Sequence, residues 1–204
     1  MSLRIWLPLN GDLENKGLDD IVVVNNGATI DNSGKIGKCY SFDGNYQYIS
    51  IQNSMDIGTS DFTLSAWFYL VQTSGKTYQP IISSKQSSAA SNGFAIYWNQ
   101  NQNKFLWSTA DGSSATEIWT LNTFDSSIYN KWHHIVMIRN NSDIKKGYFY
   151  IDGIRYELAS IPTIRNIKNF TKTQIGHSDT ASSSYCWTGK INDVRIYDHA
   201  LSIK

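Results

Sequence analysis

The chain has 204 residues, of which 41% are apolar and 13% aromatic, enough to bury one hydrophobic core without a disulfide or metal ion to support the fold. Eighteen Lys and Arg residues balance 17 Asp and Glu residues, so the net charge is +1, and neither sign forms a run longer than a pair. Because nucleic acids and anionic membrane surfaces bind clustered basic patches, we expect neither as a partner.

The two ends of the chain carry no targeting feature. At the beginning, a short apolar run meets Pro8 and Asn10 before the core of a signal peptide could form. No apolar stretch elsewhere reaches the roughly 18 residues that a membrane span needs. We therefore expect no signal peptide and no membrane insertion in the chain as given. Residues 200–204 have no terminating character, which is consistent with a segment excised from a longer protein.

Strand patterns dominate the chain, and helical patterns are nearly absent. No window places apolar residues at helical spacing for more than a turn or two, whereas short runs of aromatic and β-branched residues recur between Gly, Asn, Asp and Ser. Such regular spacing predicts an all-β fold, a two-sheet antiparallel β-sandwich or jelly roll, that occupies residues 1–204 as a single domain. The predicted strands are residues 4–9, 38–42, 46–51, 61–70, 80–84, 93–98, 104–109, 116–121, 132–139, 147–151, 154–158, 171–175 and 191–197.

Two of these regions predict local geometry. The pair Asp152-Gly153 offers the positive-φ positions of a two-residue hairpin turn, so the runs on either side should pair antiparallel. Between residues 62 and 70, apolar side chains alternate with two hydroxyl-bearing residues and with Trp67 and Tyr69. One face of this strand is expected in the core, and the other, half polar and half aromatic, is a candidate binding surface.

The two cysteines lie far apart in the sequence. Cys39 and Cys186 are separated by 147 positions, which excludes a CxxC motif for metal binding or redox chemistry. Two buried, reduced thiols are one interpretation, and a disulfide that ties the first part of the chain to the last is the other.

A family resemblance is carried by four segments of the sequence: residues 37–44 with 48–51, residues 61–68, residues 131–136 with 148–153, and residues 189–202. They occur in the order that is typical of laminin G-like domains, which are concanavalin A-like jelly rolls related to lectins and glucanases, and the chain resembles these domains over most of its length. The opening, residues 5–17, resembles the start of such domains in phage and prophage structural proteins. The resemblance implies a jelly roll and a location on a virion or an extracellular surface.

The distribution of the acidic residues along the sequence argues against catalysis. A retaining glycosidase needs two carboxylates about 5 to 5.5 Å apart, and hydrolases of the resembled fold carry them closely spaced on one strand. Here Glu occurs only at Glu14, Glu117 and Glu157, each of them isolated. The family's usual hydrolytic route would require an unforeseen pair, such as Asp111 or Asp125 with Glu117. We therefore expect that the chain is not an enzyme.

Histidines offer no clear metal site. His133 and His134 are adjacent in a predicted strand, so they should face opposite sides and cannot chelate one ion together. His177 and His199 are isolated, and no HxH or HxxxH spacing occurs. Phosphate-binding loops and the GxSxG nucleophile motif are absent as well.

Calcium is the one cofactor that the resemblance leaves open. Asp43, after the first core strand, and Asp193, in the closing strand, match positions where related domains often hold a structural ion. Carboxylate and carbonyl oxygens are the ligands that calcium prefers. The alternative is that Asp43 only forms a turn with the following Gly and that Asp193 caps or pairs locally.

A sugar site requires aromatic rings that stack on a pyranose, beside amides and hydroxyls that bind its hydroxyl groups. Tyr97 and Trp119 are the first residues that we expect to contact a ligand, together with Trp107, Tyr78 and Asn99. The full set of aromatic residues near polar loops or on polar strand faces is Tyr69, Tyr78, Tyr97, Trp98, Trp107, Trp119 and Tyr185.

Three functions remain open at this point. The favoured hypothesis is a non-catalytic module that binds a glycan or a cell-surface polysaccharide. The alternative is a structural or decoration module of a phage particle, whose partners are other virion proteins. The third is a glycoside hydrolase, which depends on the unforeseen carboxylate pair.

Overall fold

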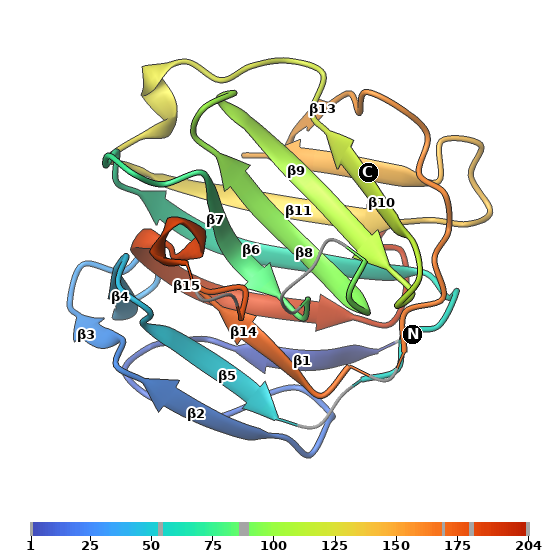
Figure 1. Cartoon of the computed structure of the whole chain (residues 1–204). Coiled ribbons are helices and arrows are strands. Elements are labelled where there is room, and N and C mark those ends of the chain that lie inside the picture. The colour runs from blue at the N-terminus through green and yellow to red at the C-terminus, as the bar shows by residue number, and fades with distance from the viewer. Residues whose placement is uncertain (1, 53–54, 86–89, 169, 180–181, 203–204) are drawn as a thin grey trace.

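A computed structural model describes residues 2–52, 55–85, 90–168, 170–179 and 182–202 of the chain. These residues form two antiparallel sheets packed face to face, which confirms the predicted all-β sandwich (Figure 1). Helical structure among them is limited to two 3-10 turns, η1 (Ser126–Ile128) and η2 (Ser183–Tyr185). No helix in the described ranges is long and apolar enough to cross a bilayer.

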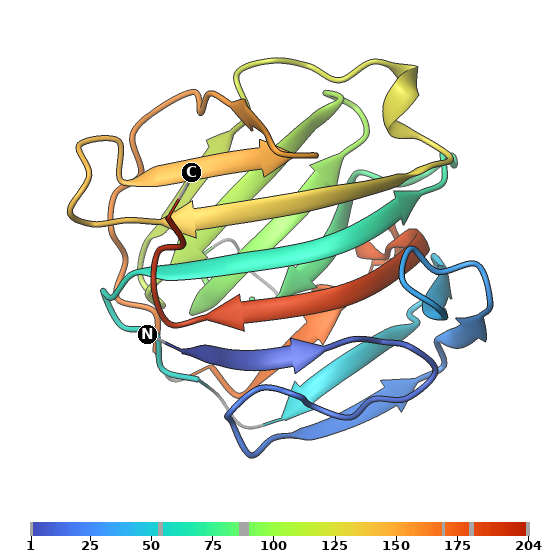
Figure 2. The same ribbon diagram turned by 180° about the vertical axis from the view of Figure 1, so that it is seen from behind.

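The eight-stranded sheet, which faces the viewer in Figure 2, has the order β13 (Ile154–Tyr156), β12 (Gly147–Ile151), β11 (Trp132–Arg139), β6 (Phe62–Leu70), β15 (Thr188–Tyr197), β4 (Cys39–Asp43) and β3 (Thr29–Asp31), with β1 (Leu3–Leu7) also beside β15. On the side away from β6, β15 pairs first with β4 and then with β1. Its pairing with β6 is interrupted between Asn192 and Arg195, where Asp193 has a φ of 53°. This bulge lies where the strand changes partners.

The seven-stranded sheet, which faces the viewer in Figure 1, has the order β10 (Ala115–Trp119), β9 (Lys104–Ala110), β8 (Gly93–Asn99), β7 (Tyr78–Ser83), β14 (Lys172–Ile175), β5 (Tyr48–Gln52) and β2 (Val22–Asn26). Strands β7 to β10, which are consecutive in the sequence, are neighbours in the sheet, and β14 links this group to β5 and β2. The sheet therefore presents four adjacent strands from one continuous stretch of sequence.

Alternate side chains of both sheets point into the space between them and form the hydrophobic core. In β8, Phe94 and Trp98 point inward. The Trp98 ring contacts Phe105 of β9, and Phe105 in turn contacts Phe68 of β6 in the opposite sheet, with ring centroids 5.0 and 5.5 Å apart. The residues between these inward positions are left on the outer face of the sheet.

Some elements match the predictions from sequence, and two do not. The predicted hairpin is confirmed, because Asp152 (φ 52°) and Gly153 (φ 77°) join β12 to β13 in antiparallel pairing. No strand is predicted at β2 or β3, yet both form. Each lies at the edge of a sheet and leaves apolar side chains exposed, Val22 to 57% and Ile30 to 52%, although Val23 packs partly against the core. A strand that buries so little of its apolar surface gives a weak signal for the prediction.

Both cysteines are free and buried, as the two-thiol interpretation predicts. Burial, with a smaller contribution from Asp31, raises the pKa of Cys39 to about 11. The Cys186 Sγ accepts a hydrogen bond from the Tyr46 backbone N–H at 3.3 Å, and burial raises its pKa as well. A high pKa and burial both suppress the reactive thiolate.

We therefore expect neither thiol to react with Ellman's reagent at pH 7.5 in the folded protein, and both to react in guanidinium chloride. The measurement is the absorbance released per chain under the two conditions, with and without prior reduction. Equal titres with and without reduction are expected. A titre that rises only after reduction would indicate a disulfide instead.

Candidate functional site

The outer face of β7 to β10 carries two rows of side chains that run across the strands. One row is formed by Tyr97, Leu106 and Trp119, which pair with one another across β8, β9 and β10. The neighbouring row places Ser108 of β9 opposite Glu117 of β10. Because outward positions alternate with core positions, each residue of these rows is flanked along its strand by an inward-facing one. The face is therefore set by the same register that builds the core.

Four aromatic residues gather on this face, and we refer to Tyr78, Tyr97, Trp119 and Tyr185 as the aromatic cluster. Tyr78 lies at its centre. Its ring stacks on Tyr185 at 5.4 Å and 24°, meets Tyr97 edge-on at 6.0 Å and lies 6.1 Å from Trp119. Tyr78, Trp119 and Tyr185 are partly exposed, whereas Tyr97 is only 7% exposed. Three rings are thus available at the surface, and the fourth supports them.

The hydroxyl of Tyr97 anchors the cluster to the sheet. Its Oη lies 2.7 Å from Ser178 Oγ and 3.5 Å from Ser83 Oγ, and the two serine oxygens lie 3.1 Å apart. Burial raises the pKa of Tyr97, so the phenol stays protonated at neutral pH. Ser178 follows β14 in the sequence, and the network therefore fixes Ser178 against β7 and β8.

A charged pair, Lys85 and Glu117, lies beside the aromatic cluster. The Lys85 ammonium donates a hydrogen bond to Ser108 Oγ at 2.5 Å and lies 3.9 Å from Glu117 Oε1. The lysine side chain is 2% exposed and the glutamate side chain 41% exposed. Burial lowers the pKa of Lys85 to about 8, although the Glu117 charge acts in the opposite direction.

The structure brings together three of the five residues predicted to contact a ligand. Tyr78, Tyr97 and Trp119 belong to the aromatic cluster, as does Tyr185, which the sequence places near a polar loop. The sequence gives no signal for Lys85, because an isolated lysine after a strand is ordinarily exposed.

Two of the five predictions are wrong. Trp107 is 2% exposed and points into the core, where it lies against Gly147 of the opposite sheet. It precedes the outward-facing Ser108 by one position, and a one-residue step reverses the face. Asn99 is also 2% exposed, and its Oδ1 accepts a hydrogen bond from the Gln102 backbone N–H at 2.9 Å, so it serves the turn between β8 and β9.

The carboxylates considered for hydrolysis have other partners. Asp111 accepts hydrogen bonds from Ser113 and Ser114 and lies 3.6 Å from Arg165, and Asp125 caps η1. Glu117 faces the Lys85 ammonium instead. Glu117 thus lies beside a cation, which is the arrangement of an ion pair and not that of a glycosidase carboxylate pair.

The two aspartates predicted for calcium lie apart, Asp43 at the end of β4 and Asp193 within β15. Asp43 is exposed, pairs with Thr188 in register and accepts the Asn45 N–H at 2.7 Å. Asp193, five positions beyond Thr188, accepts the Trp6 indole N–H at 2.7 Å and lies 3.0 Å from Arg195. Within the described ranges, no group of three or more His, Cys, Asp or Glu is placed to hold a metal ion. Calcium at either aspartate stays a prediction, which thermal unfolding with calcium and with EDTA would check.

The histidine prediction is confirmed in its geometry. His133 points inward, where it lies 2.6 Å from Asp152 Oδ2 and 5.5 Å from the Phe68 ring, whereas His134 lies on the outer face 4.9 Å from the Trp67 ring.

The outer face of β6, which we predict as a candidate binding surface, is occupied by cations from other segments. The Lys35 ammonium lies 4.7 Å above the Trp67 ring, and the Lys190 ammonium lies 5.5 Å above the Tyr69 ring. A ligand that stacked on either ring would first have to displace its cation, at the loss of a favourable cation–π contact. Among the described residues, no such cation–π contact involves the aromatic cluster of the opposite sheet.

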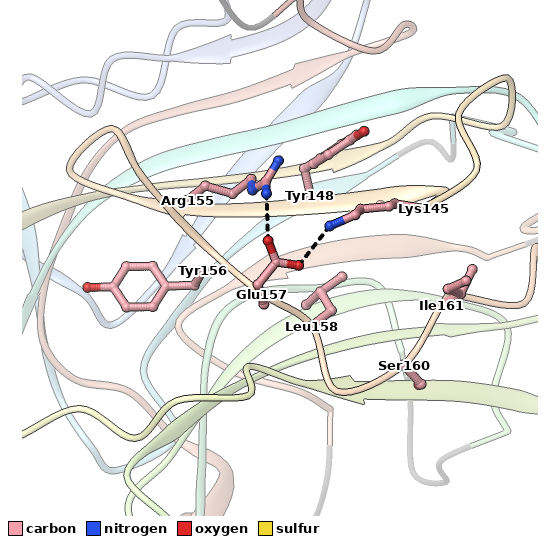
Figure 3. Close-up of a pocket in the computed structure, with 9 residues that line it drawn as sticks. Lys145, Tyr148, Arg155, Tyr156, Glu157, Leu158, Ser160 and Ile161 are labelled. Carbon is pink, nitrogen blue, oxygen red and sulfur yellow. Dashed lines mark hydrogen bonds and ion pairs between the residues drawn. The ribbon is translucent and has the colours of Figure 1, made fainter.

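A groove of about 190 Å³ lies at the β12–β13 edge. In Figure 3, the Glu157 carboxylate reaches Arg155 on one side and Lys145 on the other, at 2.6 and 3.0 Å, while the Tyr156 ring points away from them. The three charged side chains are nearly half exposed and satisfy one another. Exposed pairs of this kind contribute little free energy. Because its charged side chains are exposed, the groove lacks a buried charged residue such as Lys85 beside the β7–β10 face.

Known proteins resemble the chain in sequence profile and in structure. The profile described as the concanavalin A-like lectin/glucanases superfamily matches residues 43–204. The binding domain of Paraclostridial mosquitocidal protein 1 is similar at 20% identity and a TM-score of 0.75, over 98% of this chain and 50% of that one. For the binding domain of botulinum neurotoxin serotype G, these values are 14%, 0.72, 98% and 49%.

A third solved structure differs in length. Domain 4 of AbnA, an extracellular arabinanase from Geobacillus stearothermophilus, is similar at 15% identity and a TM-score of 0.72, over 98% of this chain and 94% of that one. The chain thus spans about half the length of the toxin binding domains and nearly all of the arabinanase domain. At these identities the likeness establishes a shared fold. No curated protein sequence matches the chain significantly.

Proposed function

Because the chain belongs to the concanavalin A-like lectin/glucanases superfamily, we propose that it is a non-catalytic module that binds carbohydrate on the outer face of β7 to β10. The observation that carries this proposal is the aromatic cluster, whose partly exposed rings lie next to Glu117 and Ser108. A sugar presents an apolar face to aromatic rings and hydroxyl groups to polar side chains. This face offers both within one pair of adjacent rows.

Structural neighbours support this proposal. Domain 4 of AbnA was solved in complex with arabinotriose, and the toxin segments are described as binding domains. The alignment covers nearly all of the sugar-bound domain, which supports a sugar-binding module of this size. We also propose that the module binds its sugar on a cell-surface polysaccharide or as part of a virion.

Replacing Trp119 by Ala is expected to reduce glycan affinity about tenfold, because a stacking platform is lost while the sheet is preserved. A glycan array with the wild-type protein identifies the ligand, and calorimetry with that ligand measures the change. Trp132→Ala, on the opposite sheet, is the matched control and is expected to leave the affinity unchanged. The absence of any binding at millimolar glycan, or an equal loss in both variants, would contradict the proposal.

The phage alternative predicts a different result. A decoration module would contact other virion proteins, so it should copurify with particles or form symmetric oligomers in solution. Mass spectrometry of purified particles and light scattering of the isolated chain measure these outcomes. A monomer with glycan affinity that depends on Trp119 would favour the carbohydrate proposal over this alternative.

A further inference from the structure

Lys85 is a buried cation at the edge of the proposed sugar site. It lies two positions beyond the end of β7, and its side chain is 2% exposed. Lysine is rarely buried to this extent unless its ammonium is paired, because removing the charge from water is unfavourable. Here the ammonium has Ser108 Oγ at 2.5 Å and Glu117 Oε1 at 3.9 Å. Because the lysine is so deeply buried, it offers almost no surface for contact with a ligand. Any effect on the ligand must therefore pass through these two partners.

Glu117 is the partner that reaches the surface. Its side chain is 41% exposed, and Ser108 Oγ donates to its Oε1 at 3.4 Å. Glu117 and Trp119 lie two positions apart on the same face of β10, which separates their attachment points by about 7 Å. A sugar that stacked on Trp119 would therefore bring its hydroxyl groups close to this carboxylate.

Other lysines near this face are directed elsewhere. The Lys76 ammonium donates to the Gly44 and Ser183 carbonyls at 2.5 and 2.8 Å, and the Lys104 ammonium donates to the Leu121 carbonyl at 2.9 Å. Within the described residues, Lys172 of the neighbouring β14 pairs with Asp179 at 3.0 Å, and Glu117 is the exposed charge on the same strand face as Trp119. A carboxylate accepts charge-assisted hydrogen bonds from hydroxyl groups and repels anions.

We propose that Lys85 is a positioning residue that holds the Glu117 carboxylate beside the aromatic cluster, where it binds hydroxyl groups of an uncharged sugar and excludes acidic sugars. This inference rests on the proposed carbohydrate function and specifies its ligand class. The expected ligand is a neutral or amino-bearing glycan without carboxylate or sulfate groups at the bound unit.

Ligand binding should then depend on the protonation of Lys85. The groups that face its ammonium are the Glu117 carboxylate from β10 and the Ser108 hydroxyl from β9, and the phenols of Tyr97 and Tyr185 interact electrostatically with Glu117. The pKa of Lys85 is lowered to about 8, whereas burial raises the pKa values of both phenols. Between pH 7 and 9, Lys85 is consequently the group in this set that changes charge, and Glu117 loses its partner.

The first arm of the experiment tests the ligand class. A glycan array presents each neutral oligosaccharide next to its sialylated or uronic acid counterpart. The wild-type protein is expected to prefer the neutral member at least tenfold, and Glu117→Gln should lower that preference. Glu157→Gln, an exposed carboxylate at the β12–β13 edge, is the matched control and should leave the preference unchanged. A wild-type preference for the acidic members overturns the inference, even though it would leave carbohydrate binding in place.

The second arm tests the role of Lys85 by pH. The wild-type affinity for the array-selected glycan should fall several-fold between pH 7 and 9. Lys85→Met should bind weakly at both values, whereas Lys85→Arg should keep its affinity at pH 9. Wild-type affinity in Lys85→Met, or a flat profile in the wild type, contradicts a positioning role.

A third readout needs no ligand. NMR titration of the Lys85 side chain should give a pKa near 8 in the wild type and a lower value in Glu117→Gln, because the neighbouring negative charge is removed. An unchanged value means that the two residues are not coupled, and the inference fails whether or not glycans bind. If the array shows no binding while Glu117→Gln lowers the Lys85 pKa as expected, the proposed function is refuted, and the proposed ligand class fails with it.

Discussion

Replacing Arg139 by Leu is expected to lower the free energy of unfolding by about 3 to 5 kcal/mol. The Arg139 side chain, in β11, is 1% exposed, and its guanidinium donates to three backbone carbonyls. Nε bonds the Ser60 oxygen at 2.7 Å, Nη2 the Gly58 oxygen at 2.9 Å, and Nη1 the Arg165 oxygen at 3.0 Å. Leucine fills part of the volume but leaves these carbonyls without their donor, and an unmatched buried acceptor is strongly unfavourable.

The guanidinium connects segments that no strand pairing holds to β11. It lies 4.7 Å above the Phe62 ring and joins the turn before β6 to residue 165, in the segment before β14. Burial lowers the pKa of Arg139 to about 10, so the group stays charged at neutral pH. Urea unfolding at pH 7 measures the effect, and Arg155→Leu is the matched control. Because Arg155 is 46% exposed, its replacement should change stability by less than about 0.5 kcal/mol. A loss below about 1 kcal/mol for Arg139→Leu would show that water replaces the guanidinium at the carbonyls.

The two-sheet sandwich and most of its strands could be predicted from the sequence because most strands have one face in the core. In β6 and β8 the core residues alternate with outward ones, and this period of two is visible without a structure. β2 and β3 were not predictable in the same way, since their apolar residues lie at exposed edges. Propensity alone cannot distinguish such an edge from a loop.

The candidate site was predictable only in part, for a related reason. The sequence shows which aromatic residues are close to polar ones, but the face of the sheet on which each ring lies depends on strand register. Tyr97 and Trp107 illustrate this, because both stand in strands next to polar residues, and only Tyr97 points outward. A register shift of one residue in β8 would turn Tyr97 inward, and the same shift in β9 would turn Trp107 outward.

Long-range contacts account for the remainder of the site. Tyr185 stacks on Tyr78 across more than a hundred positions of sequence, because η2 returns to the outer face of β7. Lys85 is buried because Ser108 and Glu117, on two other strands, receive its ammonium. Neither arrangement leaves a local pattern, so no reading of neighbouring residues could find it.

Replacing Lys85 by Met is expected to stabilise the folded protein at pH 7 by on the order of 2 to 3 kcal/mol. The pKa of Lys85 falls from 10.5 to about 8 on folding, chiefly through burial, so the folded state disfavours the charged form. This destabilisation is fully present below about pH 8 and is relieved as the pH rises towards 10.5. Methionine fills a similar volume and carries no charge, so its advantage over lysine should shrink over the same interval.

Urea unfolding of both proteins at pH 7 and pH 9.5 measures this difference. Tyrosines and cysteines also titrate at the higher pH, but they are common to both proteins and cancel in the comparison. Lys145→Met, at a lysine that is 46% exposed, is the matched control and should give the same small change at both values. A pH-independent gain would trace the effect to packing instead of ionisation. If Lys85→Met is more stable at pH 7 and also binds glycan more weakly, the buried charge is retained for ligand binding at the expense of stability, which a purely structural lysine would not show.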